Sequence, residues 1–262
     1  NGHIKTWWIR IRRGVLQHNP WGKLYYLRCK EKMRAQVIVI PGNETSELGF
    51  NRLLKSYKDT EQEFSIGNFE ASTPFTAEHE MNDFDITWNY PWEGQVSDFA
   101  TGLIKRAYVG RDPRARIACA MSHFRLWAEC FETKETFLIL EHDAYFIKQI
   151  PIDVILEWDY QIIGINDPLG ATRKAREFKR LIELDPNFVQ NVPSIDEFNV
   201  PQGIAGNSAY IITPEGAERC MSAVFKYGLW PNDAIMCKQL VRGMGVTKHH
   251  YTRVQGLPST TT

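Results

Sequence analysis

The sequence predicts an α/β protein with a mostly parallel central sheet and helices on both of its faces. Two observations predict this fold. Short, continuous apolar runs rich in β-branched residues alternate with segments of helical periodicity, and several of these runs end directly in turn residues. Runs of this kind are typical of strands buried on both faces. The chain has 262 residues, 43% of them hydrophobic, so it can bury a full core, and a disordered polypeptide is excluded.

The first strand is expected at residues 37–40, where four apolar, β-branched side chains follow one another. It ends at the turn formed by Pro41, Gly42 and Asn43. A helix should follow this turn, and a second strand is expected at residues 64–69. Strand, helix and strand in this order predict a βαβ unit with parallel strands and a right-handed crossover.

The rest of the chain continues the alternation. Residues 72–95 are crowded with Pro, Asn, Asp and Gly, and we expect irregular structure there. Apolar positions recur at three- and four-residue steps over residues 116–131, which indicates an amphipathic helix. The apolar run 137–140 predicts another buried strand. Two more strands are expected, at residues 160–165 and at residues 209–212. A helix should begin after the second of them, at Thr213-Pro214.

Residues 1–35 form a basic N-terminal extension, and residues 36–262 are expected to form the main domain. The formal net charge is zero, but the extension has a single acid, Glu31, against nine basic residues: Lys5, Arg10, Arg12, Arg13, Lys23, Arg28, Lys30, Lys32 and Arg34. Its aromatic runs flank a turn-like segment, which predicts a β-hairpin. Such an extension either packs its aromatic side chains on the main domain or binds nucleic acid or an anionic membrane surface.

The cysteines and the hydropathy pattern bear on the compartment. The five cysteines are odd in number and form no Cys-x-x-Cys pair, which favours buried thiols over a disulfide framework or a zinc site. No stretch approaches the roughly 20 apolar residues of a membrane span, and the N-terminus lacks the layout of a signal peptide. We therefore expect a cytoplasmic protein, either free or held peripherally on a membrane or nucleic acid.

Two carboxylates follow the buried strand at 137–140. Glu141 and Asp143 should project to one side at the C-terminal edge of the sheet, where open α/β sheets bind ligands. They repel each other there, and Mn²⁺ or Mg²⁺ would remove that cost while bridging substrate phosphates. A pair of solvated turn acids is the alternative. His142 should point to the opposite side, where we favour a hydrogen-bonded structural residue over a further metal ligand.

Several motifs carry a more specific signal when taken together. One helix contains Cys119, Ser122 and His123 in the spacing Cys-x-x-Ser-His, and the following strand closes in Glu141-His142-Asp143. Residues 209–217, Asp233, residues 254–255 and residues 259–260 follow in order. This combination resembles glycosyltransferase family 25, the lipooligosaccharide and collagen galactosyltransferase type, whose motifs are a Cys-x-x-Ser-His helix, a strand ending in Glu-Asp-Asp and an Ala-Tyr-Ile-Ile-Ser-x-x-Gly-Ala segment.

The resemblance implies a GT-A fold, a nucleotide-sugar donor with a UDP-sugar favoured, and a metal that bridges the donor diphosphate. The outer acids of Glu-Asp-Asp fall on Glu141 and Asp143, while His142 replaces the middle Asp. The resemblance also places an acid at Asp233. Asp233 could take the proton of the acceptor hydroxyl and so give inversion in one displacement. Alternatively, it lies in the first turn of a helix that is expected to begin at Asn232 and continue through Val241, where the helix dipole favours an acid.

Further candidates follow from position along the chain. His249 and His250 lie near the C-terminus, where GT-A enzymes often supply a third metal ligand, although exposed paired histidines are commonly inert. The turn Pro41-Gly42-Asn43 follows the first strand, and together with Glu141 it is expected to hold the nucleotide. As an alternative, this segment is an ordinary tight turn. His123 is expected to support the fold and not to catalyse.

A second basic segment follows the strand expected at 160–165. It is either a solvated helix face or a surface for an anionic acceptor, and its charges are Arg173, Lys174, Arg176, Lys179 and Arg180.

The function that these observations favour is transfer of a hexose or pentose from a nucleotide sugar to a hydroxyl acceptor. The acceptor would be a saccharide, a lipid-linked glycan or a modified nucleic-acid base. The alternative is a non-catalytic nucleic-acid-binding protein on a degenerate transferase fold, which the basic extension and His142 would favour. A metal-dependent hydrolase is less well supported, because no second carboxylate pair with metal spacing is visible.

Overall fold

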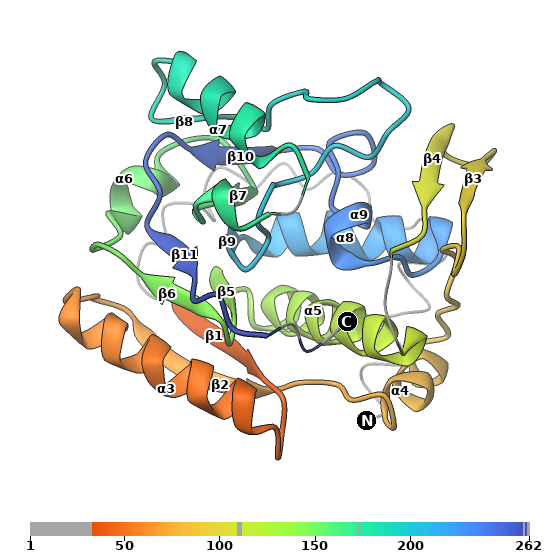
Figure 1. Ribbon diagram of the computed structural model, residues 1–262, viewed down its shortest axis with the longest axis horizontal. Helices are drawn as coiled ribbons and strands as arrows, with labels where there is room; N and C mark the ends of the chain where they lie inside the picture. Colours follow the sequence, from red (N-terminus) through yellow and green to blue (C-terminus); the bar gives the residue numbers. More distant parts are fainter. Residues whose placement is uncertain (1–32, 109–111, 172, 259, 261–262) are drawn as a thin grey trace. The chain divides into compact units, whose positions relative to one another are not determined.

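The computed structural model describes residues 33–108, 112–171, 173–258 and 260. The hairpin expected in the basic extension falls on residues 1–32 and lies outside the described residues. Met33–Thr262 form one compact unit, which is shown in Figure 1. Its first strand, β1 (Arg34–Val39), begins two residues before the expected domain start.

A seven-stranded sheet forms the centre of this unit, in the order β2-β1-β5-β9-β7-β10-β8. Strands β2, β1 and β5 are parallel, β9 runs antiparallel to both of its neighbours, β7 and β10 are parallel, and β8 is antiparallel to β10. The mostly parallel sheet predicted from the sequence is therefore confirmed. The strands after β1 are β2 (Ser65–Glu70), β5 (Phe137–Glu141), β7 (Ile162–Gly164), β8 (Val189–Asn191), β9 (Ala209–Ile212) and β10 (Met244–Thr247).

The opening βαβ unit is present as predicted. Helix α3 (Glu44–Asp59) begins after Asn43, whose side-chain oxygen accepts a hydrogen bond from the Ser46 amide. This satisfies one of the amide groups that the first turn of a helix leaves without a partner. The parallel register of β1 and β5 sets Ile38 opposite Glu141, so the turn after β1 and the acids after β5 leave the sheet at the same edge.

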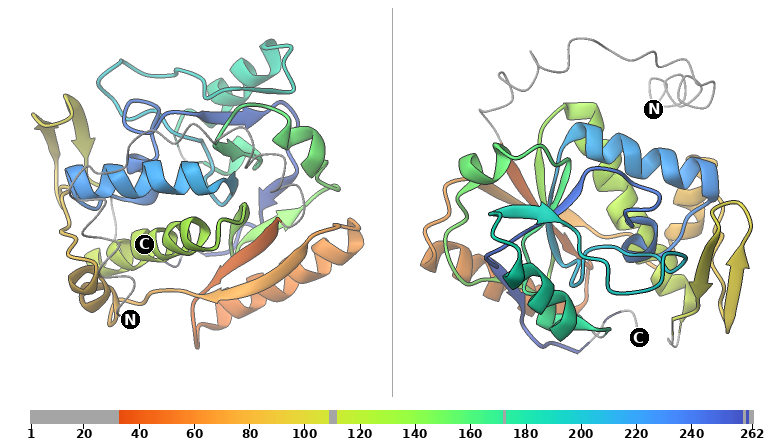
Figure 2. Two further views of the ribbon diagram at one scale, coloured as in Figure 1. Left: turned by 180° about the vertical axis from the view of Figure 1, so that it is seen from behind. Right: turned by 90° about the horizontal axis from the view of Figure 1, so that it is seen from above.

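Helices cover both faces of the sheet (Figure 2). Helices α5 (Pro113–Thr133) and α8 (Pro214–Tyr227) pack side by side on one face, as Figure 1 also shows. Helix α3 contacts β1, and it joins α6 (Ile152–Leu156) on the other face. The core beneath α3 and α6 is made of alternate strand residues such as Val37, Leu138 and Ile211, all buried.

Smaller elements complete the unit. Two antiparallel pairs lie outside the main sheet: β3 (Gln95–Asp98) with β4 (Leu103–Arg106), and β6 (Ala144–Phe146) with β11 (Thr252–Val254). The remaining helices are α4 (Ala77–Asp83), the 3-10 turn η2 (Pro168–Gly170), α7 (Ala175–Leu184) and α9 (Asn232–Ile235).

Two sequence-based expectations need correction. The segment 72–95 is not irregular throughout, because α4 lies within it and packs on α5. The helix expected to continue from Asn232 through Val241 ends at Ile235. Met236 leaves helical geometry, and Cys237 then forms a β-bridge with Gly203. Pairing with a distant segment therefore overrides the local helical pattern.

The structure also bears on the cysteines and on membrane spans. Four of the cysteines fall in the described residues, and all are free thiols: Cys119, Cys130, Cys220 and Cys237. In the described part of the chain, no helix combines the length and apolar character needed to cross a bilayer.

The contact between α8 and the sheet leaves no room for a side chain at Gly216. A Cβ there would lie 2.5 Å from the carbonyl oxygen of Gln161 and 2.9 Å from Cγ1 of Ile162. We predict that Gly216→Ala destabilises the protein by about 1–3 kcal/mol, because a backbone atom cannot move aside cheaply. Thermal unfolding should therefore occur several degrees lower. Gly67→Ala is the control, since its nearest neighbour would be a flexible Gln36 side chain at 3.5 Å. Equal melting temperatures of the two variants would contradict the prediction.

Candidate active site

The two predicted metal carboxylates lie together at the C-terminal edge of the sheet. Glu141 is the last residue of β5, and Asp143 stands in the turn before β6. Oδ1 of Asp143 is buried and has no hydrogen-bond partner. Burial, and after it the negative charge of Glu141, raises the pKa of Asp143 to about 7. This carboxylate is therefore poorly stabilised by the protein alone.

His142 takes the structural role expected from strand alternation. Its ring is buried against α3, where a Cβ at Gly49 would lie 3.2 Å from the ring carbon Cδ2. The ring also hydrogen-bonds to the backbone of Ile38, and burial lowers its pKa. The neutral imidazole of His142 therefore lies on the α3 side of the sheet, on the face opposite to α5.

A chain of buried hydrogen bonds reaches Glu141 from the core. The indole Nε1 of Trp127 donates to the Tyr210 hydroxyl at 2.9 Å, and that hydroxyl lies 2.8 Å from Nδ1 of His123. Since an indole can only donate, the Tyr210 hydrogen is free to point at His123. The imidazole proton then sits on Nε2, 3.3 Å from Oε1 of Glu141. His123 therefore has the supporting role expected for it, and the residue that it holds in place is Glu141.

The thiol of Cys119 completes this corner of the site. Cys119 and His123 are four residues apart on α5, and one ligand atom from each of Cys119, His123 and Glu141 lies within 4.8 Å of the others. The sequence alone places Cys119 and His123 on one face of a helix, because residues at i and i+4 share a face. The sequence does not show that both lie beside Glu141, because this contact depends on how α5 crosses β5.

Asp233 comes close to the same acids. It lies in the single turn of α9, and its carboxylate accepts a hydrogen bond from the Tyr108 hydroxyl. Solvent reaches its side chain, yet the surrounding protein raises its pKa through desolvation, and the charge of Glu141 adds to that effect. The structure therefore brings together Asp233 and Glu141, which are 92 positions apart in the sequence.

Aromatic side chains extend outward from Asp233. Tyr108 stacks on Tyr90 with ring centres 5.9 Å apart, Tyr90 meets Trp88 edge to face at 6.3 Å, and Trp88 stacks on Trp92 at 4.8 Å. Tyr108 and Trp92 are exposed. We call these four residues the aromatic wall. Three of these residues lie in the stretch 72–95, for which the sequence predicted irregular structure.

The other predicted site residues have separate surroundings. The ring of His249 packs on Phe188, and the strongest electrostatic partners of His250 are Asp167 and Lys179. Neither histidine belongs to the metal-competent group at Glu141 among the described residues. In the turn after β1, the Asn43 side chain caps α3, while Gly42 has a positive φ of 68° and open space where a Cβ would be.

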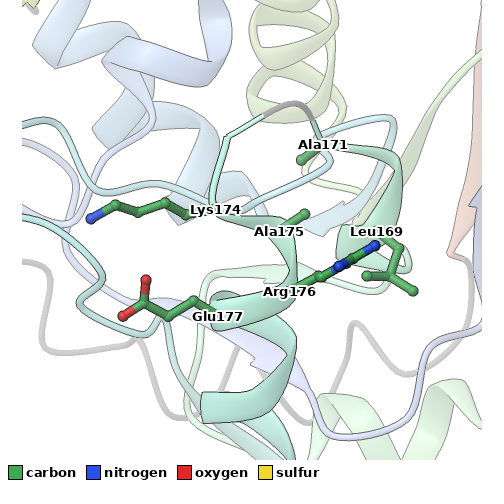
Figure 3. A pocket seen from close by; sticks show the side chains of 6 residues that line it. All are labelled: Leu169, Ala171, Lys174, Ala175, Arg176 and Glu177. Carbon is green, nitrogen blue, oxygen red and sulfur yellow. The ribbon is translucent and has the colours of Figure 1, made fainter.

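The second basic segment is largely ion-paired. Arg173 and Lys174 both contact Asp196, at 2.9 and 2.8 Å, and Lys179 contacts Asp167 at 2.9 Å. A hollow of about 630 Å³ lies beside this segment (Figure 3), lined by Leu169, Ala171, Lys174, Ala175, Arg176 and Glu177. In Figure 3, Arg176 extends toward Leu169 and Lys174 extends away from it. None of the acids described above lines this hollow.

Residues 113–236 match the model of glycosyltransferase family 25, described as LPS biosynthesis protein. This is the family that the sequence motifs resemble. It contains α5, β5, β9, α8 and α9, and with them Cys119, His123, Glu141, Asp143 and Asp233.

Comparison with solved structures finds, among others, the bifunctional glycosyltransferase WbbM in its apo form, with a TM-score of 0.39 and 8% sequence identity. The match covers 82% of this chain and 38% of that chain, so the present sequence spans well under half the length of this neighbour. The search of curated proteins gave no match.

The buried charge of Asp143 should make stability depend on pH when no metal is bound. The folded-state pKa is near 7 against an ordinary value of 3.8, so the folded protein holds a proton that the unfolded chain releases. Stability should therefore fall as pH rises from about 4 to 7, with a slope of up to about 1.4 kcal/mol per pH unit.

We predict that Asp143→Asn, in chelator, gains stability over the wild type as pH rises from 5 to 7.5. Denaturant unfolding at several pH values measures this. Asp153→Asn, an exposed acid on α6, should show no such trend. A constant difference between Asp143→Asn and the wild type at all pH values would contradict the prediction.

Proposed function

We propose that this protein transfers a sugar from a nucleotide-sugar donor to a hydroxyl acceptor, with Mn²⁺ or Mg²⁺ held by Glu141 and Asp143. The observation that carries the proposal is the partnerless, buried Oδ1 of Asp143 beside the charge of Glu141, at the C-terminal edge of β5. Open α/β sheets bind their ligands at this edge.

A hard divalent cation fits these two residues. Both offer carboxylate oxygens, which Mn²⁺ and Mg²⁺ prefer. A cation would give the buried Oδ1 of Asp143 a partner and offset its repulsion from Glu141. When bound, it would neutralise the charge of the leaving diphosphate. His142 does not hinder this arrangement, because its ring is buried on the other side of the strand.

The turn Pro41-Gly42-Asn43 supports a place for the nucleotide. It follows β1, whose register with β5 sets it beside the carboxylates. The open space at Gly42 allows a ligand to approach the backbone. A UDP-sugar is the favoured donor because of the resemblance to family 25.

Asp233 is the proposed general base. A carboxylate with a raised pKa is a better proton acceptor. Desolvation raises the pKa of Asp233. The hydrogen bond from Tyr108 orients the carboxylate. If Asp233 removes the acceptor proton as the new glycosidic bond forms, the sugar is transferred with inversion in one step.

The aromatic wall beside Asp233 favours a saccharide acceptor. Ligand sites commonly combine aromatic surfaces with a few placed polar groups, and flat rings can cover the apolar face of a sugar. The exposed rings of Tyr108 and Trp92 offer such surfaces. A lipid-linked glycan would use the same wall through its sugar, and a modified nucleic-acid base remains a third acceptor to be assayed.

The donor site is tested by thermal stabilisation with nucleoside diphosphates and Mn²⁺. We predict that UDP with Mn²⁺ raises the melting temperature by several degrees, since ligand at about 100 times Kd adds about 2.7 kcal/mol. UDP in chelator should give little shift, and Asp143→Asn should lose the effect of Mn²⁺. If UDP in chelator stabilises the wild type and Asp143→Asn equally, the metal has no part in donor binding and the proposed metal role is wrong. Salt-sensitive DNA binding without donor turnover would instead favour the nucleic-acid-binding alternative.

The proposed base is tested by Asp233→Asn, which keeps the shape and the hydrogen bond but cannot accept the proton. We predict a fall in kcat of at least about 100-fold. The melting temperature and the UDP–Mn²⁺ shift should stay nearly unchanged. Asp196→Asn provides a control at an acid outside the candidate site, beside the basic segment. Normal turnover by Asp233→Asn would leave Asp233 as a helix-start residue only.

A further inference from the structure

Cys119, His123 and Glu141 form a cluster whose composition differs from that of the carboxylate pair. We infer that this thiolate–imidazole–carboxylate cluster is a binding site for Zn²⁺, separate in its chemistry from the Mn²⁺ or Mg²⁺ site and sharing Glu141 with it. We call it the Cys119 cluster. The ligand atoms of the three residues all lie within 4.8 Å of one another.

The geometry of the Cys119 cluster suits a tetrahedral ion. Zinc binds imidazole nitrogen and carboxylate oxygen at about 2.0–2.2 Å, so two such ligands on a tetrahedron stand about 3.4 Å apart. The observed distance from Nε2 of His123 to Oε1 of Glu141 is 3.3 Å. Cys119 approaches from the same helix face, one turn before His123. Among the described residues its thiol makes one weak hydrogen bond, to Asn232 Oδ1 at 3.7 Å, so little has to be broken.

The surroundings of His123 can support metal ligation. A metal-bound imidazole usually donates its other ring N–H to a nearby acceptor. When Nε2 binds zinc, the ring proton moves to Nδ1, where the Tyr210 oxygen lies at 2.8 Å. That oxygen has two lone pairs and can accept this bond as well as the one from Trp127. The hydroxyl hydrogen then loses His123 as its acceptor, a cost that the zinc–nitrogen bond must exceed. Binding releases the thiol proton of Cys119 to solvent, so the site gains one thiolate for each Zn²⁺ taken up.

Charge and ligand softness favour zinc over the harder ions. The charges of Glu141, Asp233 and Asp143 all act on Cys119, so a cation experiences a negative potential there. A thiolate and an imidazole select Zn²⁺ over Mg²⁺ or Mn²⁺. Cys119 and Glu141 are partly exposed, which gives an ion access from solvent, while His123 is fully buried and fixed.

A consequence follows if the proposed function is correct. Each ion would draw on the carboxylate of Glu141, and two divalent cations held this close repel each other. Zinc in the Cys119 cluster would therefore weaken binding of the donor-bridging cation. Zn²⁺ should therefore inhibit Mn²⁺-supported transfer by occupying a neighbouring site.

The site is tested with Co²⁺, whose bond to a thiolate gives a charge-transfer band in the near ultraviolet. The full, metal-free chain should bind one Co²⁺ with this band, and one equivalent of Zn²⁺ should remove it. Cys119→Ser and Cys119→Ala should lose the band and weaken Zn²⁺ binding at least about 100-fold, with near-ultraviolet circular dichroism confirming that they fold. Cys220→Ala, which removes a buried thiol elsewhere, and Cys29→Ser should keep the band. A band that persists in both Cys119 variants, or no band in the wild type, would overturn the inference.

Inhibition is measured separately. Zn²⁺ should inhibit Mn²⁺-supported turnover of the wild type, and Cys119→Ser should need at least about tenfold more Zn²⁺ for the same fractional loss of its own rate. Equal sensitivity of the two proteins would refute competition through this cluster. If the protein turns over no donor, the proposed function fails while the Co²⁺ titration still decides whether the cluster binds metal.

Discussion

The buried hydroxyl of Tyr210 is the contact on which the candidate site depends. It joins Trp127 and His123 of α5 to strand β9, and through His123 it fixes the carboxylate of Glu141. Because the three donor side chains are fully buried, each needs its partner, and an unpaired buried polar group costs about 1–3 kcal/mol. The core therefore specifies where one acid of the site stands, before any ligand binds.

The chain concentrates negative charge at one edge of the sheet and leaves it incompletely balanced. Asp143 has a buried oxygen without a partner, and the pKa values of Asp143 and Asp233 are both raised by desolvation, with the charge of Glu141 adding to each. Charged groups of one sign in a partly dry place are costly unless a counter-ion or a proton joins them. This imbalance connects the proposed cation, the proposed base and the Cys119 cluster, since all three depend on the field of the same acids.

The antiparallel strand β9 has a particular part in this arrangement. It lies between β5 and β7, so Tyr210 stands beside β5 and beneath α5. It then leads into α8, which begins at Thr213 as a capping residue and packs closely over Gly216. The second layer of helices and the hydroxyl that anchors Glu141 thus come from one short stretch of chain. A side chain at Gly216 would disturb the helix layer, because α8 would have to move away from Gln161.

The sequence by itself determined the elements whose cause is local. The apolar runs predicted β1, β5 and β9, the three- and four-residue spacing predicted α5, and Thr213-Pro214 predicted the start of α8. Strand alternation also separated His142 from Glu141, because side-chain direction in a strand repeats every two residues. The motifs also indicated the family whose model matches residues 113–236. The expectations failed at α4 and at the end of α9, where packing and a bridge to Gly203 outweigh local preference.

Only the tertiary structure decided which distant residues meet. Cys119 meets Glu141 because α5 crosses the sheet at β5, and Asp233 meets Tyr108 because α9 lies beside the segment that follows β4. No spacing in the sequence encodes that crossing, since it depends on how side chains fill the space between whole elements.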